Sequence, residues 1–427
     1  MDFQELLRGR DACACGRAHR CPIDFVQIGP GALASLRELC APYRHILLLS
    51  DANTYRACGE AVYQQIADRV ETNRILLSNG DVVIPNEEKI EEIEACLTDA
   101  TDLLVGVGSG VINDLCKYVS HKHGLRYFIV ATAPSMDGYA SVGAALVLGG
   151  MKVTRNARPP KAIVADTAVL KAAPMEMLRA GYGDIIGKFS CLNDWKLSAL
   201  LNGEYFCPFV YGLTYSTALR VKSLAQGVCC REETAVEALM EALVAVGIAM
   251  SYVDCSRPAS GSEHHLAHFF EITGILDQTP YFAHGIDVAY ASVETAKLRE
   301  RILASRPQRR PFDRAAWERE IRRVYTSCAD GVIALQNKLG WYEQDDLATV
   351  ESKREEICAV LAEAPTAEEF EAMLAAVGLD INEFYATYGD AKIADAVRYG
   401  KDLKDRYTVL WLYDRYFTDV DETFCMA

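Results

Sequence analysis

Short apolar runs alternate with stretches of helical periodicity in the first part of the chain. The helical stretches include 54–68 and 87–96. The apolar runs that they separate lie at 46–49, 74–77, 103–105, 127–131 and 162–165. Short strands spaced by helices are typical of a parallel sheet with right-handed crossovers. The pattern therefore predicts an α/β region built on a parallel sheet.

Two glycine-containing turn signals interrupt this pattern, at 79–81 (Asn-Gly-Asp) and at 147–150 (Val-Leu-Gly-Gly). The second signal lies between the apolar segments 144–148 and 151–154. We therefore expect a β-hairpin inserted into the α/β pattern.

After Pro174 the apolar positions take helical spacing, and β-branched runs become rare. The helical pattern is clearest at 235–252, 332–339, 351–361 and 394–416. We therefore predict an α/β domain over residues 1–174 and an all-helical domain over residues 175–427. A ligand site is expected in the cleft between two such domains.

The composition is that of a folded protein, and 427 residues are too many for one ordinary core. The N-terminal MDFQELLRGRD is too polar for a signal peptide, and no apolar stretch is long enough to cross a bilayer. The 15 cysteines, an odd number, fit a reducing compartment. We expect a cytoplasmic protein with no membrane partner.

The formal net charge of −15, without a dense stripe of Lys and Arg, argues against a nucleic-acid partner. Affinity for nucleic acid comes chiefly from neutralising phosphates with cations. A small phosphorylated substrate is not excluded, because a metal and a few local cations can outweigh the overall charge.

One cysteine cluster near the N-terminus has two interpretations. Cys13, Cys15, His19 and Cys21 are residue types that bind zinc. Their spacing is cramped and matches no standard zinc knuckle. The alternative is a group of ordinary reduced thiols, which the spacing favours.

A strand that runs into glycines and then a helix, at 103–114, is a candidate nucleotide site. Gly106, Gly108 and Gly110 let the backbone approach a phosphate, and the free N–H groups at the helix start favour an anion. Asp51 follows the first clear strand, where an acid commonly meets a ribose hydroxyl. Each feature has a plain alternative, which is a tight turn without a ligand for the glycines and a helix N-cap for Asp51.

Four of the eight histidines lie between positions 264 and 284. His264 and His268 are four residues apart on a predicted helix, so they project from one face, and His284 precedes a glycine. This spacing indicates a metal or proton-transfer site, although core histidines are the alternative. A carboxylate ligand would lower the charge of such a site. Asp184, with glycines on both sides that allow close approach and an unusual turn, is one candidate among many.

Five segments together resemble the sn-glycerol-1-phosphate dehydrogenases, within the superfamily of iron-type alcohol dehydrogenases, glycerol dehydrogenases and dehydroquinate synthases. The segments are TAPSMDGYAS (132–141), ARPPKAIVADT (157–167), GYGDIIGKFSCLNDWKLS (181–198), SRPASGSEHHLAHFFE (256–271) and FAHG (282–285). The resemblance implies a dehydroquinate synthase-like fold. In that fold a Rossmann-like NAD(P)-binding domain precedes a helical domain for metal and substrate.

The resemblance also implies roles for individual residues. It implies metal ligation by Asp184, His264 and His284, and substrate contacts from Asp137, Asp184 and His268. The implied cofactor contacts are Gly110, Val111, Ile112, Asn113, Asp114, Thr132, Ala133, Pro134, Ser135 and Ser141.

The reaction implied is reversible hydride transfer between NAD or NADP and C2 of glycerol 1-phosphate, with dihydroxyacetone phosphate as the ketone. One divalent metal, which is zinc, nickel or iron, would act as a Lewis acid. We expect a homodimer. Three alternatives remain: a dehydroquinate synthase-like lyase, a dehydrogenase of unphosphorylated glycerol, and a non-catalytic binding protein that keeps the fold.

Overall fold

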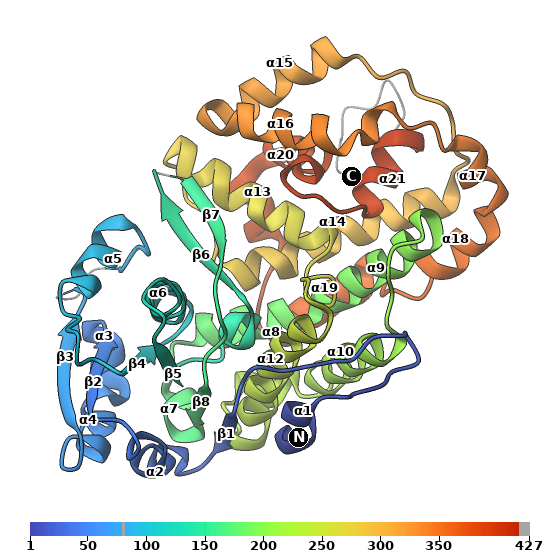
Figure 1. Ribbon diagram of the computed structural model, residues 1–427. Coiled ribbons are helices and arrows are strands. Elements are labelled where there is room, and N and C mark those ends of the chain that lie inside the picture. The colour runs from blue at the N-terminus through green and yellow to red at the C-terminus, as the bar shows by residue number, and fades with distance from the viewer. Residues whose placement is uncertain (79–81, 150, 418–427) are drawn as a thin grey trace. The chain divides into compact units, whose positions relative to one another are not determined.

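In the computed structural model the chain folds into two compact units, whose elements Figure 1 labels. The residues that the structure describes are 1–78, 82–149 and 151–417. Unit 1 comprises Met1–Ile185 and Gly212–Cys255, and unit 2 comprises Ile186–Tyr211 and Ser256–Ala427. The turn predicted at 79–81 lies outside the described residues, as does Gly150 of the second predicted turn.

Unit 1 is built on a six-stranded sheet with the strand order β1-β8-β5-β4-β2-β3. The strands are β1 (Phe25–Gly29), β2 (His45–Ser50), β3 (Glu71–Leu76), β4 (Leu103–Gly108), β5 (Arg126–Ala131) and β8 (Ala162–Asp166). Every pair of neighbours is parallel, which confirms the predicted α/β architecture. The pattern did not predict β1, an edge strand whose residues are mostly half-buried and include the polar Gln27.

The winding direction of this sheet reverses between β2 and β4. The chain places β3 on one side of β2 and β4 on the other, and then continues outward to β5. In open α/β sheets, ligands bind beyond the carboxyl ends of the strands at such a switch point. Asp51 follows β2 and the glycine segment follows β4, so both candidate cofactor features flank this position.

Helices cover both faces of the sheet. Alternate residues of β4, Val105 and Val107 among them, join side chains of α2 (Leu36–Cys40) and α4 (Glu60–Ile66) in one buried core. Gly106 and Gly108 alternate with these valines along the strand, so they lie on the other face of the sheet. There they face α6 (Gly110–Lys122). The other helices of the segment Met1–Ala172 are α1 (Phe3–Arg8), α3 (Ala52–Thr54), α5 (Glu87–Glu94) and α7 (Thr167–Ala172).

The predicted helix at 54–68 is interrupted, because a π-helical turn, Tyr55–Gly59, separates α3 from α4. The predicted hairpin is confirmed. Its strands β6 (Gly143–Leu148) and β7 (Met151–Asn156) are antiparallel and pair with each other.

The division into two compact units does not follow the predicted boundary after residue 174. The helices α8 (Met175–Ile186) and α10 (Pro208–Lys222) cross from one unit to the other, and α11 (Ala225–Cys229) and α12 (Glu233–Val253) belong to unit 1. This happens because α12 packs against β1, α7 and the short 3-10 helix η3 (Asp137–Ala140). The functional division at residue 174 stays a prediction.

Among the described residues, α12 is the one helix long and apolar enough to cross a membrane by length and composition. In this structure 94% of its most apolar window is buried. Its sequence is therefore that of a core helix, whose all-round apolarity matches its burial.

Unit 2 is all-helical in its described part, as predicted. Its helices are α9 (Lys188–Asn202), α13 (Ser262–Asp277), α14 (His284–Ala304), α15 (Arg314–Tyr325), α16 (Ala329–Leu339), α17 (Leu347–Ser352), α18 (Arg354–Leu361), α19 (Ala367–Ala376), α20 (Ile381–Tyr399) and α21 (Val409–Tyr416). The pattern at 394–416 is not one helix. A 3-10 turn, Gly400–Leu403, and an extended Thr408 separate α20 from α21.

Candidate functional site

The glycines at the end of β4, Gly106 and Gly108, are required by packing. A Cβ atom at Gly106 would lie 2.7 Å from Cys116 Sγ, and one at Gly108 would lie 2.5 Å from the Ile112 side chain. Both neighbours belong to α6, so the glycines let this helix lie against the end of β4. They draw the start of α6 close to the switch point of the sheet.

The start of α6 keeps its backbone donors available. Its N-cap residue, Ser109, makes no side-chain capping hydrogen bond, and Gly110 opens the helix without a side chain. The first N–H groups of a helix have no partner within the helix, so they favour an anion. The implied cofactor contacts from Gly110 to Asp114 stay a prediction, which this geometry supports.

Asp51 is the N-cap of α3, which was the alternative interpretation of this residue. Its Oδ1 accepts hydrogen bonds from Asn53 N at 2.7 Å and Thr54 N at 2.9 Å. Both bonds use the same oxygen, so the second carboxylate oxygen remains for a ligand. A ribose contact from Asp51 is compatible with the cap and stays a prediction.

Lys117 is a residue that the sequence did not single out. Its fully buried ammonium donates to Asp114 Oδ1 at 3.2 Å, Gly138 O at 2.9 Å, Ser141 Oγ at 3.2 Å and Gly143 O at 2.8 Å. Burial lowers the pKa of Lys117, while the Asp114 carboxylate acts in the opposite direction. The ammonium thus ties the first turns of α6 to the segment that contains Ser141.

The segment after β5, with Thr132, Ala133, Pro134 and Ser135, is fixed against α8. A Cβ atom at Gly181 would lie 1.8 Å from Pro134 O. The Asp184 carboxylate, fully buried, accepts a hydrogen bond from Asp137 N at 2.9 Å. The close approach expected at the glycines is confirmed at Gly181, but the unusual turn expected around Asp184 is wrong, because Met175–Ile186 is helical.

Three imidazole rings cluster in unit 2. His264 and His268 lie on α13, and His284 is the first residue of α14. The ring centroids are 6.0 Å apart for His264 and His268, 5.2 Å for His264 and His284, and 5.3 Å for His268 and His284. The expected histidine cluster is therefore present.

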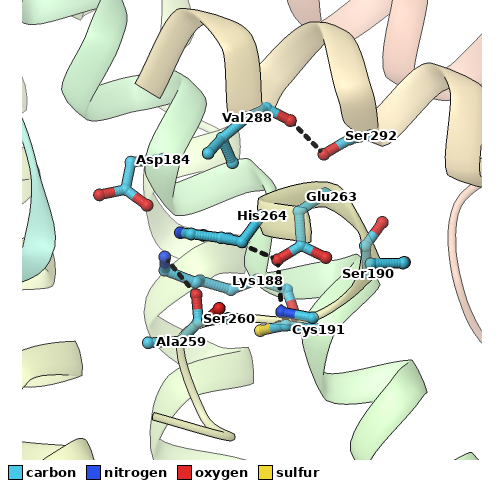
Figure 2. Close-up of polar contacts among 12 residues, drawn as sticks. Asp184, Lys188, Ser190, Cys191, Ala259, Ser260, Glu263, His264, Val288 and Ser292 are labelled. Carbon is cyan, nitrogen blue, oxygen red and sulfur yellow. Dashed lines mark hydrogen bonds and ion pairs between the residues drawn. The ribbon is translucent and has the colours of Figure 1, made fainter. Parts of the chain in front are cut away.

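Two of these rings are each oriented by a buried carboxylate of their own. Glu263 Oε1 lies 2.6 Å from His264 Nδ1, and Glu271 Oε1 lies 3.1 Å from His284 Nδ1. Figure 2 shows the first pair. Because an ionised carboxylate only accepts, Nδ1 carries the proton in each neutral ring, and Nε2 keeps its lone pair. This is the usual arrangement of a metal-binding histidine, so the residues fit a divalent metal.

The fourth histidine between positions 264 and 284, His265, is a core histidine, which was the alternative interpretation of the whole group. His265 is fully buried, and burial lowers its pKa well below the usual value. It therefore stays neutral inside unit 2.

The start of α13 is held by close packing against α9. A Cβ atom at Gly261 would lie 2.6 Å from both Asp194 Oδ2 and Cys191 Cα. Asp194 accepts from Ser262 N at 2.7 Å, and burial, followed by the charge of Glu263, raises the pKa of Asp194 to about 6.

A buried lysine holds the loop that leads into α13. Lys188 donates to Ala259 O at 2.8 Å (Figure 2). The segment SRPASGSEHH (256–265) is thus held by the close packing at Gly261 and by hydrogen bonds to the buried side chains of Asp194 and Lys188. The sequence did not single out Lys188, because its partner is a backbone carbonyl that leaves no trace in the residue pattern.

Comparison with known proteins identifies similar chains. Residues 27–174 match the family model of iron-containing alcohol dehydrogenase. The chain is 35% identical to a glycerol-1-phosphate dehydrogenase [NAD(P)+] of Halalkalibacterium halodurans over 298 residues, which cover 68% of this chain and 74% of that protein. It is 32% identical to the Geobacillus stearothermophilus protein of the same name over 333 residues, which cover 74% and 81%.

A solved structure with the same fold is the iron-containing alcohol dehydrogenase of Corynebacterium glutamicum. Its TM-score is 0.59 at 17% identity, and the match covers 94% of this chain and 97% of that one. This similarity supports the predicted fold, an α/β region followed by helices.

The contact between Gly181 and Pro134 gives a test of how the segment after β5 is fixed. Gly181→Ala places a methyl group against a backbone carbonyl, so we expect it to destabilise the protein by about 1–3 kcal/mol. Gly212→Ala is the matched control, because nothing lies within 4 Å of the position that its new methyl group would take. Thermal denaturation of both variants checks this, and equal melting temperatures would contradict it.

Proposed function

The chain belongs to the glycerol-1-phosphate dehydrogenases of the iron-containing alcohol dehydrogenase family, and we propose from this premise that it interconverts dihydroxyacetone phosphate and sn-glycerol 1-phosphate. The reaction is a hydride transfer at C2, with NAD or NADP as the redox partner. It needs one divalent metal, which is zinc, nickel or iron. The observation that carries the proposal is the 35% identity to a relative of that name over 74% of its length.

Asp184, His264 and His284 hold this metal. The support is the pair of carboxylates, Glu263 and Glu271, that accept from Nδ1 of the two histidines and so place the ring lone pair on Nε2. Asp184 adds a fully buried carboxylate, which is stable only among donors and cations. Two imidazoles and one carboxylate leave coordination positions for the oxygens of the substrate.

Nucleotide binding belongs to unit 1. The start of α6, from Gly110 to Asp114, binds the pyrophosphate, chiefly with the backbone N–H groups of its first turn, and Asp51 binds a ribose hydroxyl. The segment Thr132–Ser135 and Ser141 complete the contacts. The support is the position of these segments after β2, β4 and β5, beside the switch point of the sheet.

When bound, the metal supplies a Lewis acid at the C2 oxygen and the nicotinamide supplies or accepts the hydride. His268 lies one turn from His264, and its imidazole N–H donates a hydrogen bond to the substrate. The ring relays a proton to the C2 oxygen, taking up one proton at its second nitrogen as it gives one from the first. The Asp137 carboxylate accepts from a substrate hydroxyl. The ring separations in the histidine cluster support the role of His268.

The protein works in the cytoplasm as a homodimer, with no nucleic-acid or membrane partner. The net charge of −15 and the burial of α12 support this environment. Sedimentation or light scattering of the purified protein measures the oligomeric state.

Two related activities use the same fold and are distinguished by simple assays. A dehydroquinate synthase-like lyase keeps its cofactor bound through the cycle, so it would not consume NADH in proportion to ketone. A glycerol dehydrogenase would act on the unphosphorylated ketone. A non-catalytic binding protein would show no turnover with either ketone when metal is supplied.

Substitutions of His264 and His268 test whether one histidine binds the metal and the other binds the substrate. We expect His264→Ala to lose the catalytic metal and nearly all turnover, because one of three protein ligands is gone. We expect His268→Ala to keep that metal while kcat/KM falls by about 10²-fold. Elemental analysis beside steady-state kinetics checks both. A His268 variant that loses the metal as readily as the His264 variant would show that the two roles are misassigned.

The substrate phosphate gives a second test. A site with donors for a phosphate leaves them unpaired when the phosphate is missing, and unpaired buried polar groups are costly. We expect dihydroxyacetone phosphate to be preferred over dihydroxyacetone by roughly 10³ in kcat/KM. Oxidation of NADH with each ketone, in metal-depleted and metal-restored enzyme, measures this. Equal efficiency with both ketones would leave a metal-dependent polyol dehydrogenase.

A further inference from the structure

We propose that Cys13, Cys15 and His19 bind a zinc ion in unit 1, at a second metal site that is separate from the catalytic one. Their ligand atoms, two thiol sulfurs and one imidazole nitrogen, all lie within 4.8 Å of one another. Two thiolates and one imidazole are ligands that zinc prefers. Of the four residues in the sequence cluster, the structure brings these three together, and Cys21 is not in the group.

The separation of the ligand atoms fits a tetrahedral ion. Zinc bonds are about 2.3 Å to sulfur and about 2.0–2.1 Å to nitrogen, so two such ligands at the tetrahedral angle lie about 3.6 Å apart. Cys15 Sγ lies 3.5 Å from His19 Nε2. The pair therefore already has the spacing that a shared ion requires.

The ring of His19 is oriented as a metal ligand. Its Nδ1 lies 2.8 Å from the backbone oxygen of Tyr252, and the contact is buried. Because a carbonyl only accepts, Nδ1 carries the proton and Nε2 keeps its lone pair. Nε2 is the atom that lies beside Cys15 Sγ. A carbonyl behind the ring is a common partner of metal-binding histidines.

The backbone brings the two cysteines to this nitrogen. Arg10 and His19 pair as a short antiparallel bridge, with Arg10 N donating to His19 O at 2.9 Å and His19 N donating to Arg10 O at 2.7 Å. Between them, Gly16 N donates to Cys13 O at 2.9 Å, and Gly16 has a φ of +83° that suits glycine. The loop is thus closed on itself and presents its cysteines toward His19.

A metal has a mechanical role here. Between residues 10 and 20, His19 is the one buried residue, so the loop has almost no apolar core of its own. Tyr252 lies in the last turn of α12, where backbone oxygens have no N–H partner within the helix. An ion held by Cys13, Cys15 and His19 fastens the N-terminal loop to the end of α12, as structural zinc does in small loops without a core.

Cobalt substitution tests the proposal on the full-length protein. Cobalt(II) adopts the geometry of zinc and gives a near-ultraviolet charge-transfer band when thiolates bind it. The proposed catalytic ligands contain no thiolate, so the band reports the second site alone. We expect the band in the wild-type protein and in His264→Ala, and its loss in the double variant Cys13→Ser/Cys15→Ser.

Elemental analysis after loading with zinc gives the stoichiometry. We expect two zinc ions per wild-type chain, one in the double serine variant, and two in the matched control Cys21→Ser. Turnover with dihydroxyacetone phosphate and the circular dichroism spectrum should persist in the double variant, which separates this site from the catalytic one. The proposal is overturned by the absence of a thiolate band in the wild type or by its survival in the double variant. It is also overturned by an intact mass lower by two hydrogen atoms that reveals a Cys13–Cys15 disulfide.

Discussion

The hydrogen bond from an imidazole to an acceptor behind it is the interaction on which both proposed metal sites depend. In unit 2, Glu263 and Glu271 accept from Nδ1 of His264 and His284. In unit 1, a backbone oxygen of α12 accepts from Nδ1 of His19. Each acceptor selects one tautomer and one ring orientation before any ligand arrives. The side-chain entropy of these rings is therefore lost during folding, so little of it remains to be lost when a ligand binds.

Close backbone contacts at glycines keep these groups in place. Gly181 lets α8 approach the carbonyl of Pro134, and Gly261 lets the start of α13 approach α9. At both positions a larger residue has no room, so the segments that carry the candidate site residues have one permitted packing. Buried ammonium groups, those of Lys117 and Lys188, satisfy the backbone oxygens that such tight packing removes from water. The result is a set of functional segments supported by rigid elements.

The sequence predicted the parallel sheet from short apolar runs that alternate with helical stretches, and the all-helical second part from the helical spacing of its apolar positions. It predicted the inserted hairpin from a glycine turn signal between two apolar segments. It could not predict β1, whose half-buried edge position weakens the alternation. It also identified the three clustered histidines, since their types and spacing are local. It did not find Glu263 as the partner of His264, and it treated Glu271 only as a possible neighbour of His268. The choice of one acceptor among many acids depends on tertiary contacts, which a residue pattern does not record.

The discontinuity of unit 1 has a consequence for biosynthesis. The sheet is complete at β8, yet α12, which packs against β1 and α7, is not made until residue 253. A nascent chain that ends at residue 174 therefore has a finished sheet with an uncovered apolar surface. Residues 186–211 are synthesised before α12. They belong to unit 2, which cannot be completed until the segment from Ser256 onward has been made. Domains generally fold as units during synthesis, so this order delays the folding of the N-terminal unit and lengthens its exposure to chaperones.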